Sequence, residues 1–111
     1  MSTSFPLTIV SSLGLVYDGE CEELYCPAET GPLGILPGHT PYIASIASRG
    51  ILSIKNDGKT TYYLVYHGAL EVKPDKVLVI VERALAYGAL EEAEKALEDD
   101  KNQDNATSPA F

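Results

Sequence analysis

The sequence predicts a mainly β fold: a flattened β-sandwich of about ten short strands, followed by one short C-terminal helix and a disordered tail. Short runs rich in β-branched and aromatic residues recur through residues 5–83, and turn signals separate them at the spacing typical of a sandwich or barrel. Strong helix formers gather only in Leu85–Leu97. After Glu98 the chain is polar and has no hydrophobic period, which is typical of a disordered end.

The first half of the chain contains four predicted strands and one ordered loop. The third strand should stop at Pro27, because proline cannot donate to a sheet ladder. The segment Gly34–Pro41, Gly-Ile-Leu-Pro-Gly-His-Thr-Pro, is expected to be a loop held stiff by its two prolines. The predicted strands are Leu7–Ser11, Leu13–Tyr17 (closed by a turn at Asp18-Gly19), Cys21–Cys26 and Glu29–Leu33, which contains a turn at Thr30-Gly31-Pro32.

The second half repeats the strand-and-turn pattern. Asn56–Lys59 has the residues of a tight hairpin, with a glycine where a positive φ is needed. Leu52 and Ile54 share one face of their strand. Val77–Val81 is apolar throughout, which predicts a strand buried on both faces. The predicted strands are Tyr42–Ala47, Arg49–Lys55, Thr60–Tyr66, Ala69–Val72 and Val77–Val81, with a further turn at Lys73–Lys76.

Three regions follow from this pattern: a β-sandwich domain over residues 1–84, a short helix over 85–99, and a disordered acidic tail over 100–111. Leu90, Ala93 and Leu97 fall on one face of the helix. The net charge is −8, and the part from Glu91 onward carries −5 of it, as seven acidic residues and two lysines. Without a basic patch, we expect no nucleic-acid partner.

No apolar run is long enough for a membrane helix, and the first residues do not resemble a secretory signal, so we expect no direct membrane insertion. Cys21 and Cys26 are five residues apart. If they lie on one strand they face opposite sides, so we expect reduced thiols and no disulfide between them. Two thiols with no neighbouring histidine also make a poor metal site, and we expect none.

Candidate catalytic groups are few. Glu22 and Glu23 are adjacent on a predicted strand and therefore point to opposite faces. His39 lies between Pro37 and Pro41, where two roles remain open: hydrogen bonding to the loop backbone, or contact with another subunit. For His67, which precedes Gly68, a strand-end position beside a bulge glycine is favoured. These observations favour a non-catalytic chain over an unrelated small β-barrel hydrolase.

The order of these motifs resembles the N-terminal domain of the epsilon subunit of F-type ATP synthases, from about residue 6 to residue 97. The segment Gly34–Pro41 is the most specific marker. The supporting segments are Leu7–Ser11, Tyr17–Glu20, Gly31–Leu33, Gly50–Ile54, Gly68–Val72 and Val77–Ala84.

The resemblance implies a β-sandwich in the central stalk that couples the gamma subunit to the membrane c ring, without catalysis or a cofactor. It implies a peripheral position at the cytoplasmic face of the energy-coupling membrane, near the alpha and beta catalytic subunits. The c-ring contact would be Gly31, Pro32, Leu33, Gly34, Ile35 and Leu36, and the gamma contact would be His39 and Tyr42.

The chain departs from the family pattern at three places. Pro32 stands where the family usually has an acidic or amide residue, and Tyr66-His67-Gly68 replaces a small-Gly-Gly segment. The two-helix C-terminal hairpin is largely missing, and the last arginine is Arg83. We therefore expect neither ATP binding nor hairpin-type inhibition, and the alternative function is a nucleotide-sensing or ATPase-inhibitory subunit that acts through its C-terminal helix.

Overall fold

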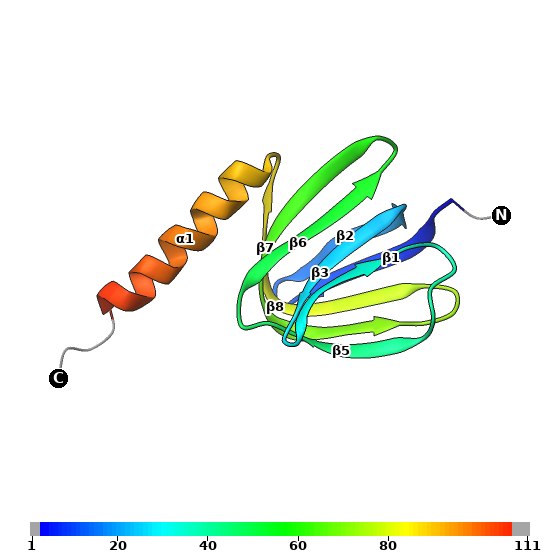
Figure 1. Cartoon of the computed structure of the whole chain (residues 1–111), viewed down its shortest axis with the longest axis horizontal. Helices are drawn as coiled ribbons and strands as arrows, with labels where there is room; N and C mark the ends of the chain where they lie inside the picture. Colours follow the sequence, from blue (N-terminus) through cyan, green and yellow to red (C-terminus); the bar gives the residue numbers. More distant parts are fainter. Residues whose placement is uncertain (1–2, 108–111) are drawn as a thin grey trace.

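The computed structural model describes residues 3–107, with the side chains of residues 103–107 left out, and has a β-sandwich with a C-terminal helix beside it (Figure 1). The predicted fold class is therefore confirmed. Within residues 3–107 the elements are β1 (Phe5–Ser11), β2 (Gly14–Cys21), β3 (Glu23–Ala28), β4 (Gly31–Ile35), β5 (Tyr42–Ile46), β6 (Gly50–Asn56), β7 (Lys59–Val72), β8 (Val77–Tyr87) and α1 (Leu90–Thr107).

Two long strands, β7 and β8, bend around one side of the sandwich and belong to both of its layers (Figure 1). One layer has the order β2-β1-β8-β7-β5, and the other continues from β8 and β7 through β6 to β3 and β4. The bend in β7 lies at His67 and Gly68, where β7 stops pairing with β6 and starts pairing with β5. His67 has a φ of 39°, but it lies inside β7 and the pairing of β7 with β8 keeps its register on both sides of it, so the predicted strand-end position beside a bulge glycine is wrong.

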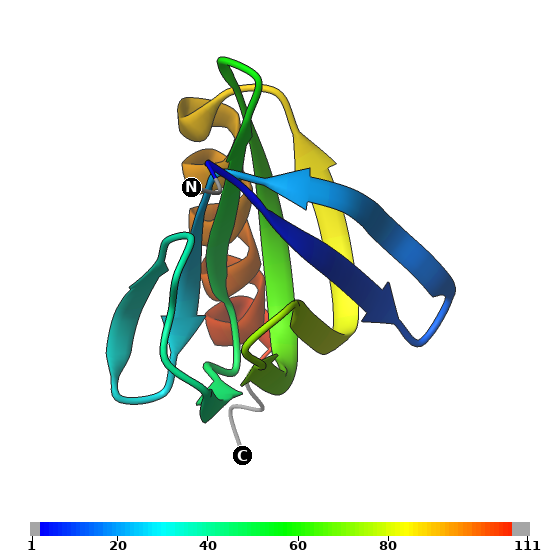
Figure 2. The ribbon, with the colours of Figure 1, turned by 90° about the vertical axis from the view of Figure 1, so that its right-hand side faces the viewer.

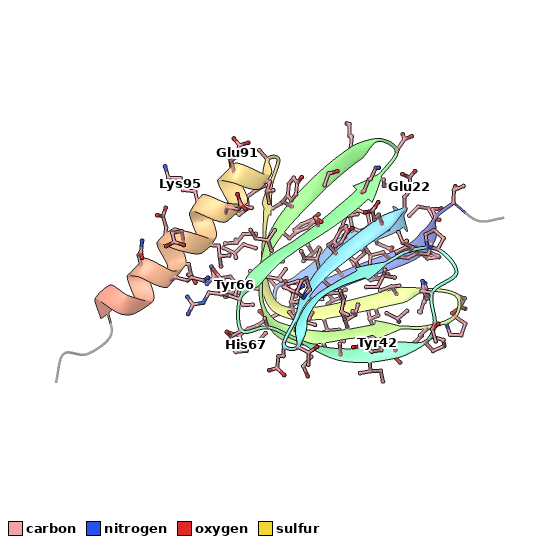
Figure 3. The ribbon with its side chains drawn as sticks, viewed as in Figure 1. Glu22, Tyr42, Tyr66, His67, Glu91 and Lys95 are labelled. Carbon is pink, nitrogen blue, oxygen red and sulfur yellow. The ribbon has the colours of Figure 1, made fainter. Side chains whose placement is uncertain are left out.

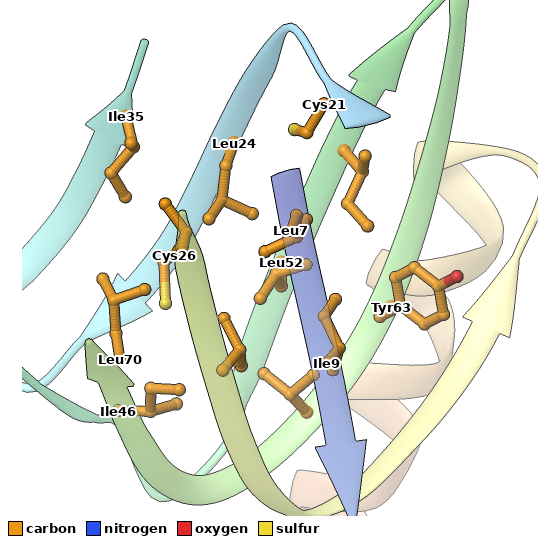
Figure 4. Close-up of a cluster of buried hydrophobic side chains, with 14 of the residues drawn as sticks. Leu7, Ile9, Cys21, Leu24, Cys26, Ile35, Ile46, Leu52, Tyr63 and Leu70 are labelled. Carbon is orange, nitrogen blue, oxygen red and sulfur yellow. The ribbon is translucent and has the colours of Figure 1, made fainter. Parts of the chain in front are cut away.

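The core lies between these two layers, as the open end of the sandwich shows in Figure 2. Alternate residues of each strand point inward, as a half-buried sheet requires. Leu52 and Ile54 are both buried, which confirms the predicted face of β6. Figure 4 shows part of this core, with Leu7, Ile9, Cys21, Leu24, Cys26, Ile46 and Leu70 among the labelled side chains. Val77 and Val79 are buried in the same core.

The helix α1 lies against β6, β7 and β8, on the outside of one layer (Figures 1 and 2). It covers Leu64, which points outward from β7 yet is only 1% exposed, and buries its own Ala93. Leu97 is half-buried on this side, but Leu90 is largely exposed, so only part of the predicted apolar face is used. No helix within residues 3–107 is long and apolar enough to cross a membrane.

Two turn predictions are confirmed and two are wrong. The hairpin at Asp57 and Gly58 has positive φ at both residues, and the turn at Lys73–Lys76 is closed by a backbone hydrogen bond. Asp18-Gly19, however, lies inside β2, because these residues pair with Thr8 and Leu7 of β1. The second wrong turn, predicted at Thr30-Gly31-Pro32, lies one residue earlier, at Glu29-Thr30, and Gly31 already begins β4.

Proline does not end β3 as predicted, since Pro27 lies within the strand and faces Pro32 of β4. The Pro27 carbonyl accepts a hydrogen bond from Ala47 N and therefore points away from β4. The N–H of a strand residue points to the same side as its carbonyl, so the N–H that proline lacks removes no hydrogen bond between β3 and β4. The predicted opposite orientation of the two cysteines is also wrong. A bend at Glu22 puts Cys21 on β2 and Cys26 on β3, and both side chains point into the core.

The strand at Val77–Val81 is buried on one face only. Val77, Val79 and Val81 point into the core, whereas Ile80 points outward and is 51% exposed. The prediction of burial on both faces is therefore wrong: a continuous apolar run gives no information on whether the outer face is covered.

The predicted region boundaries also change. The sandwich does not end at residue 84, because Ala84–Tyr87 extend β8 by pairing with β7. Pairing with a neighbouring strand overrides the helix preference of alanine. The helix begins at Leu90 and continues to Thr107. The prediction of a disordered tail from residue 100 is therefore wrong for residues 100–107. Residues 108–111 lie outside the described chain.

Candidate functional site

A loop and the adjoining edge strand form one candidate contact surface. Residues 36–41, here called the proline loop, connect β4 to β5, and Gly34 and Ile35 belong to β4 rather than to this loop. An open groove of about 510 Å³ is lined by Leu33–Tyr42. The structure thus gathers six of the eight predicted partner-binding residues around one groove. Gly31 and Pro32 lie farther along β4, beyond its lining.

The predicted c-ring segment alternates between buried and exposed side chains. Leu33 packs against the core and Ile35 is buried, so neither presents much surface. Pro32, Gly34 and Leu36 point outward, and Leu36 is 56% exposed. Only these alternate residues are accessible to a partner, as expected for a strand with one buried face.

His39 is held by the backbone on both sides of its ring. Nδ1 lies 3.2 Å from the carbonyl oxygen of Leu36, and Nε2 lies 2.6 Å from the carbonyl oxygen of Lys73. The ring also packs edge-on against Phe5, with ring centroids 5.2 Å apart and an interplanar angle of 87°. The backbone role left open by the sequence is therefore present. Contact with gamma stays a prediction.

Tyr42 lies between the groove of the proline loop and a second one of about 510 Å³. The second groove is lined by Pro41–Ile43 and by Glu71–Pro74. Tyr42 itself is partly exposed on β5, on the side of the molecule away from the helix (Figure 3). It is therefore accessible to a partner that spans both grooves.

The sequence did not predict an apolar patch on the outer face of the layer β2-β1-β8-β7-β5. Val10 pairs with Leu15 on one side and with Ile80 on the other, so the three form a row across β2, β1 and β8. In the neighbouring row, Glu71 of β7 links Leu78 to Ile43. Leu15, Ile43 and Ile80 are 65%, 73% and 51% exposed. The apolar patch, as named here, consists of Val10, Leu15, Ile43, Leu78 and Ile80.

The outer face of the other layer carries a polar cluster under the helix. Arg49 Nη1 forms an ion pair with Asp100 Oδ2 at 2.6 Å, which joins the bend before β6 to α1. The guanidinium carbon of Arg83 lies 4.8 Å from the ring centroid of Tyr66. Figure 3 shows Tyr66 on the side of the sandwich that faces the helix. Burial, and then the neighbouring Asp100 carboxylate, raise the pKa of Tyr66.

The two thiols are structural groups in this arrangement. Burial raises the pKa of Cys21 to about 11 and that of Cys26 to about 12. A thiol reacts as its thiolate, so both are protonated and inert at neutral pH. Among the side chains of residues 3–102, no three His, Cys, Asp or Glu residues gather as a metal site would require.

The fold defines a small β-sandwich domain. One outer face is covered by its own helix, and the other is open and carries the apolar patch beside Thr8, Asp18 and Glu71. Its sequence over residues 4–86 matches the family described as the β-sandwich domain of the ATP synthase delta/epsilon chain. The chain belongs to this family.

Individual relatives agree with this assignment. The ATP synthase epsilon chains of Bacillus cytotoxicus and Bacillus thuringiensis are each 43% identical over 81 residues. The matched region is 73% of this chain and 60% of each relative, so the match spans about 60% of these relatives' length.

Two solved structures have a chain of the same fold. One is the cryo-EM structure of the Euglena gracilis mitochondrial ATP synthase, containing OSCP, F1 and the c-ring, with a TM-score of 0.73 and 20% identity. That match covers 96% of this chain and 69% of the other. The other is the central stalk and c-ring of the Tetrahymena thermophila mitochondrial ATP synthase, with a TM-score of 0.60 and 13% identity. It covers 73% of this chain and 65% of the other.

Proposed function

We propose that this chain is a rotor subunit in the central stalk of an F-type ATP synthase, where it couples gamma to the c ring during ion-driven ATP synthesis. The observation that carries the proposal is the open apolar patch next to the proline-loop groove. Ile43 of the patch and Tyr42 of the proline-loop groove both line the second groove, so the two surfaces adjoin there. A subunit that transmits torque needs two such contacts on one stiff body.

In this proposal gamma covers the apolar patch and the adjoining Tyr42, with His39 ordering the loop beside them. The c ring contacts the accessible residues of β4 and the proline loop, namely Pro32, Gly34 and Leu36. A half-exposed isoleucine such as Ile80 contributes about 1 kcal/mol when a partner buries it. The chain performs no catalysis itself. It is held peripherally at the cytoplasmic face of the energy-coupling membrane, with the alpha and beta subunits as further neighbours.

Co-purification with the gamma subunit of the same ATP synthase tests this function. The full chain and gamma should form a stable 1:1 complex, and Ile80→Glu should weaken its affinity at least tenfold by placing a charge in a buried contact. The matched control is Leu90→Glu, which adds the same charge at a leucine 42% exposed on the helix. If gamma does not bind the unchanged chain, the proposed function is wrong. If the two variants bind gamma with equal affinity, the proposed face is wrong.

A further inference from the structure

The two contacts of the His39 ring cannot both be hydrogen bonds in a neutral imidazole. Nδ1 faces the carbonyl oxygen of Leu36 at 3.2 Å, and Nε2 faces that of Lys73 at 2.6 Å. Carbonyl oxygens only accept, so each ring nitrogen must carry a proton for its contact to be a hydrogen bond. A neutral ring has one N–H and one lone pair, whereas the imidazolium has two N–H groups. The observed geometry therefore matches the protonated ring.

The ring has little freedom to turn toward other partners. Phe5, itself part of the core, packs against it edge to face. The two carbonyl groups that hold the ring come from distant segments: Leu36 begins the proline loop, and Lys73, 34 residues after His39, begins the turn between β7 and β8. His39 thus connects the proline loop to the turn between β7 and β8. The number of hydrogen bonds in this connection depends on whether the ring is protonated.

The other charged groups near the His39 ring belong to the end of β7 and the turn that follows it. Glu71 and Lys73 form an ion pair at 4.0 Å, and Asp75 and Lys76 belong to the same turn. Neither β1 nor the rest of the proline loop has a titratable residue. Since Nδ1 and Nε2 both face carbonyl groups, the charge on the ring is stabilised through these two oxygens.

We propose that His39 is a proton-operated clasp on the proline loop. When the ring is protonated, both nitrogens donate and the loop is fixed to the β7–β8 turn. When it loses a proton, the shorter bond from Nε2 to Lys73 is kept, and the lone pair of Nδ1 then faces the Leu36 carbonyl and repels it. The Leu36 end of the loop is released. This proposal concerns the isolated chain and does not rest on the proposed function.

Nuclear magnetic resonance of the isotope-labelled full chain between pH 5.5 and 8.5 tests the clasp. The ring ¹⁵N shifts of His39 report its protonation and tautomer, and backbone relaxation reports the order of residues 36–41. We expect loop order to fall as His39 deprotonates, with the same midpoint, and the neutral ring to carry its proton on Nε2. A loop with equal order on both sides of the His39 titration would overturn the proposal, as would a neutral ring protonated on Nδ1.

Two variants separate the clasp from a general pH effect. His39→Gln cannot gain a charge, so its proline loop should have the mobility of the high-pH form at every pH. His67→Gln removes the other histidine, which is exposed at the β7 bend, and should leave the loop transition unchanged. A loop transition that persists in His39→Gln, or disappears in His67→Gln, refutes the assignment. If His39→Gln does not fold, the ring and loop measurements on the unchanged chain still test the proposal.

Discussion

The replacement Gly68→Ala tests the bend in β7, on which the two-layer architecture depends. Gly68 pairs with Ile46 of β5 on one side and with Val81 of β8 on the other. Its φ of 159° is one that residues with a side chain rarely adopt, so backbone strain adds to the close contact described next. A Cβ at this position would lie 1.9 Å from the backbone oxygen of Ile80 and 2.9 Å from Val81 Cα. Backbone atoms cannot rotate away as a side chain can.

The cost follows from the separation that the methyl group requires. A carbon and an oxygen in contact lie about 3.3 Å apart, so β7 and β8 would have to move apart by more than about 1 Å locally. That displacement weakens about two ladder hydrogen bonds, each worth about 1 kcal/mol net. Overpacking adds about 1–3 kcal/mol. We therefore expect a loss of about 3–5 kcal/mol, a large part of the stability of a domain of this size.

Urea unfolding followed by circular dichroism measures this loss, with two glycine variants as controls. Gly14→Ala meets no atom within 4 Å but has a φ of 124°, so it should cost only the backbone strain, about 1–3 kcal/mol. Gly88→Ala has neither a clash nor a positive φ and should be neutral or slightly stabilising. If Gly68→Ala costs no more than Gly14→Ala, the close approach of β7 and β8 is not the constraint inferred here.

Two further predictions concern ionisable groups. Because burial raises the pKa of Cys21 and Cys26 from the usual 9.0 to about 11 and 12, their contribution to stability is complete below pH 9 and is lost as pH rises. At pH 10 this loss should be about 1 kcal/mol per thiol. A double Cys→Ala variant should lose correspondingly less stability between pH 8 and 10, and equal slopes would contradict this. Asp100→Asn breaks the ion pair with Arg49 and should lower the pKa of Tyr66 and the amide-exchange protection of α1, at a cost of about 1 kcal/mol. Asp99→Asn, one residue away and exposed, is its control, and equal effects of the two variants would refute this role of the Arg49–Asp100 ion pair.

Local sequence features predicted those parts of the fold that depend on neighbouring residues. The hairpin at Asp57-Gly58 follows from the ease with which these residues adopt a positive φ. The inward face of Leu52 and Ile54 follows from the two-residue period of a strand. The family assignment likewise followed from a short segment, Gly34–Pro41, together with the order of the other motifs.

The candidate site was predicted only in part. The sequence identified the residues that line the proline-loop groove, but not the apolar patch. The patch arises because β1 pairs in parallel with β8, and β8 in turn pairs with β7, which places Val10 beside Ile80. Val10 and Ile80 are 70 residues apart in sequence. An apolar run such as Val77–Val81 has no signal that tells which side the rest of the chain will cover.

The sequence by itself therefore determined the β class, the turns at Asp57-Gly58 and Lys73–Lys76, and the family. Tertiary structure decided which apolar face is left open, how far the helix extends and what His39 contacts. The helix extends past its predicted end alongside an Arg49–Asp100 ion pair that joins residues 51 positions apart, and His39 reaches Lys73 across 34 positions. The physical reason is the same in each case: these properties depend on contacts between distant segments, and such contacts exist only after the two layers have packed.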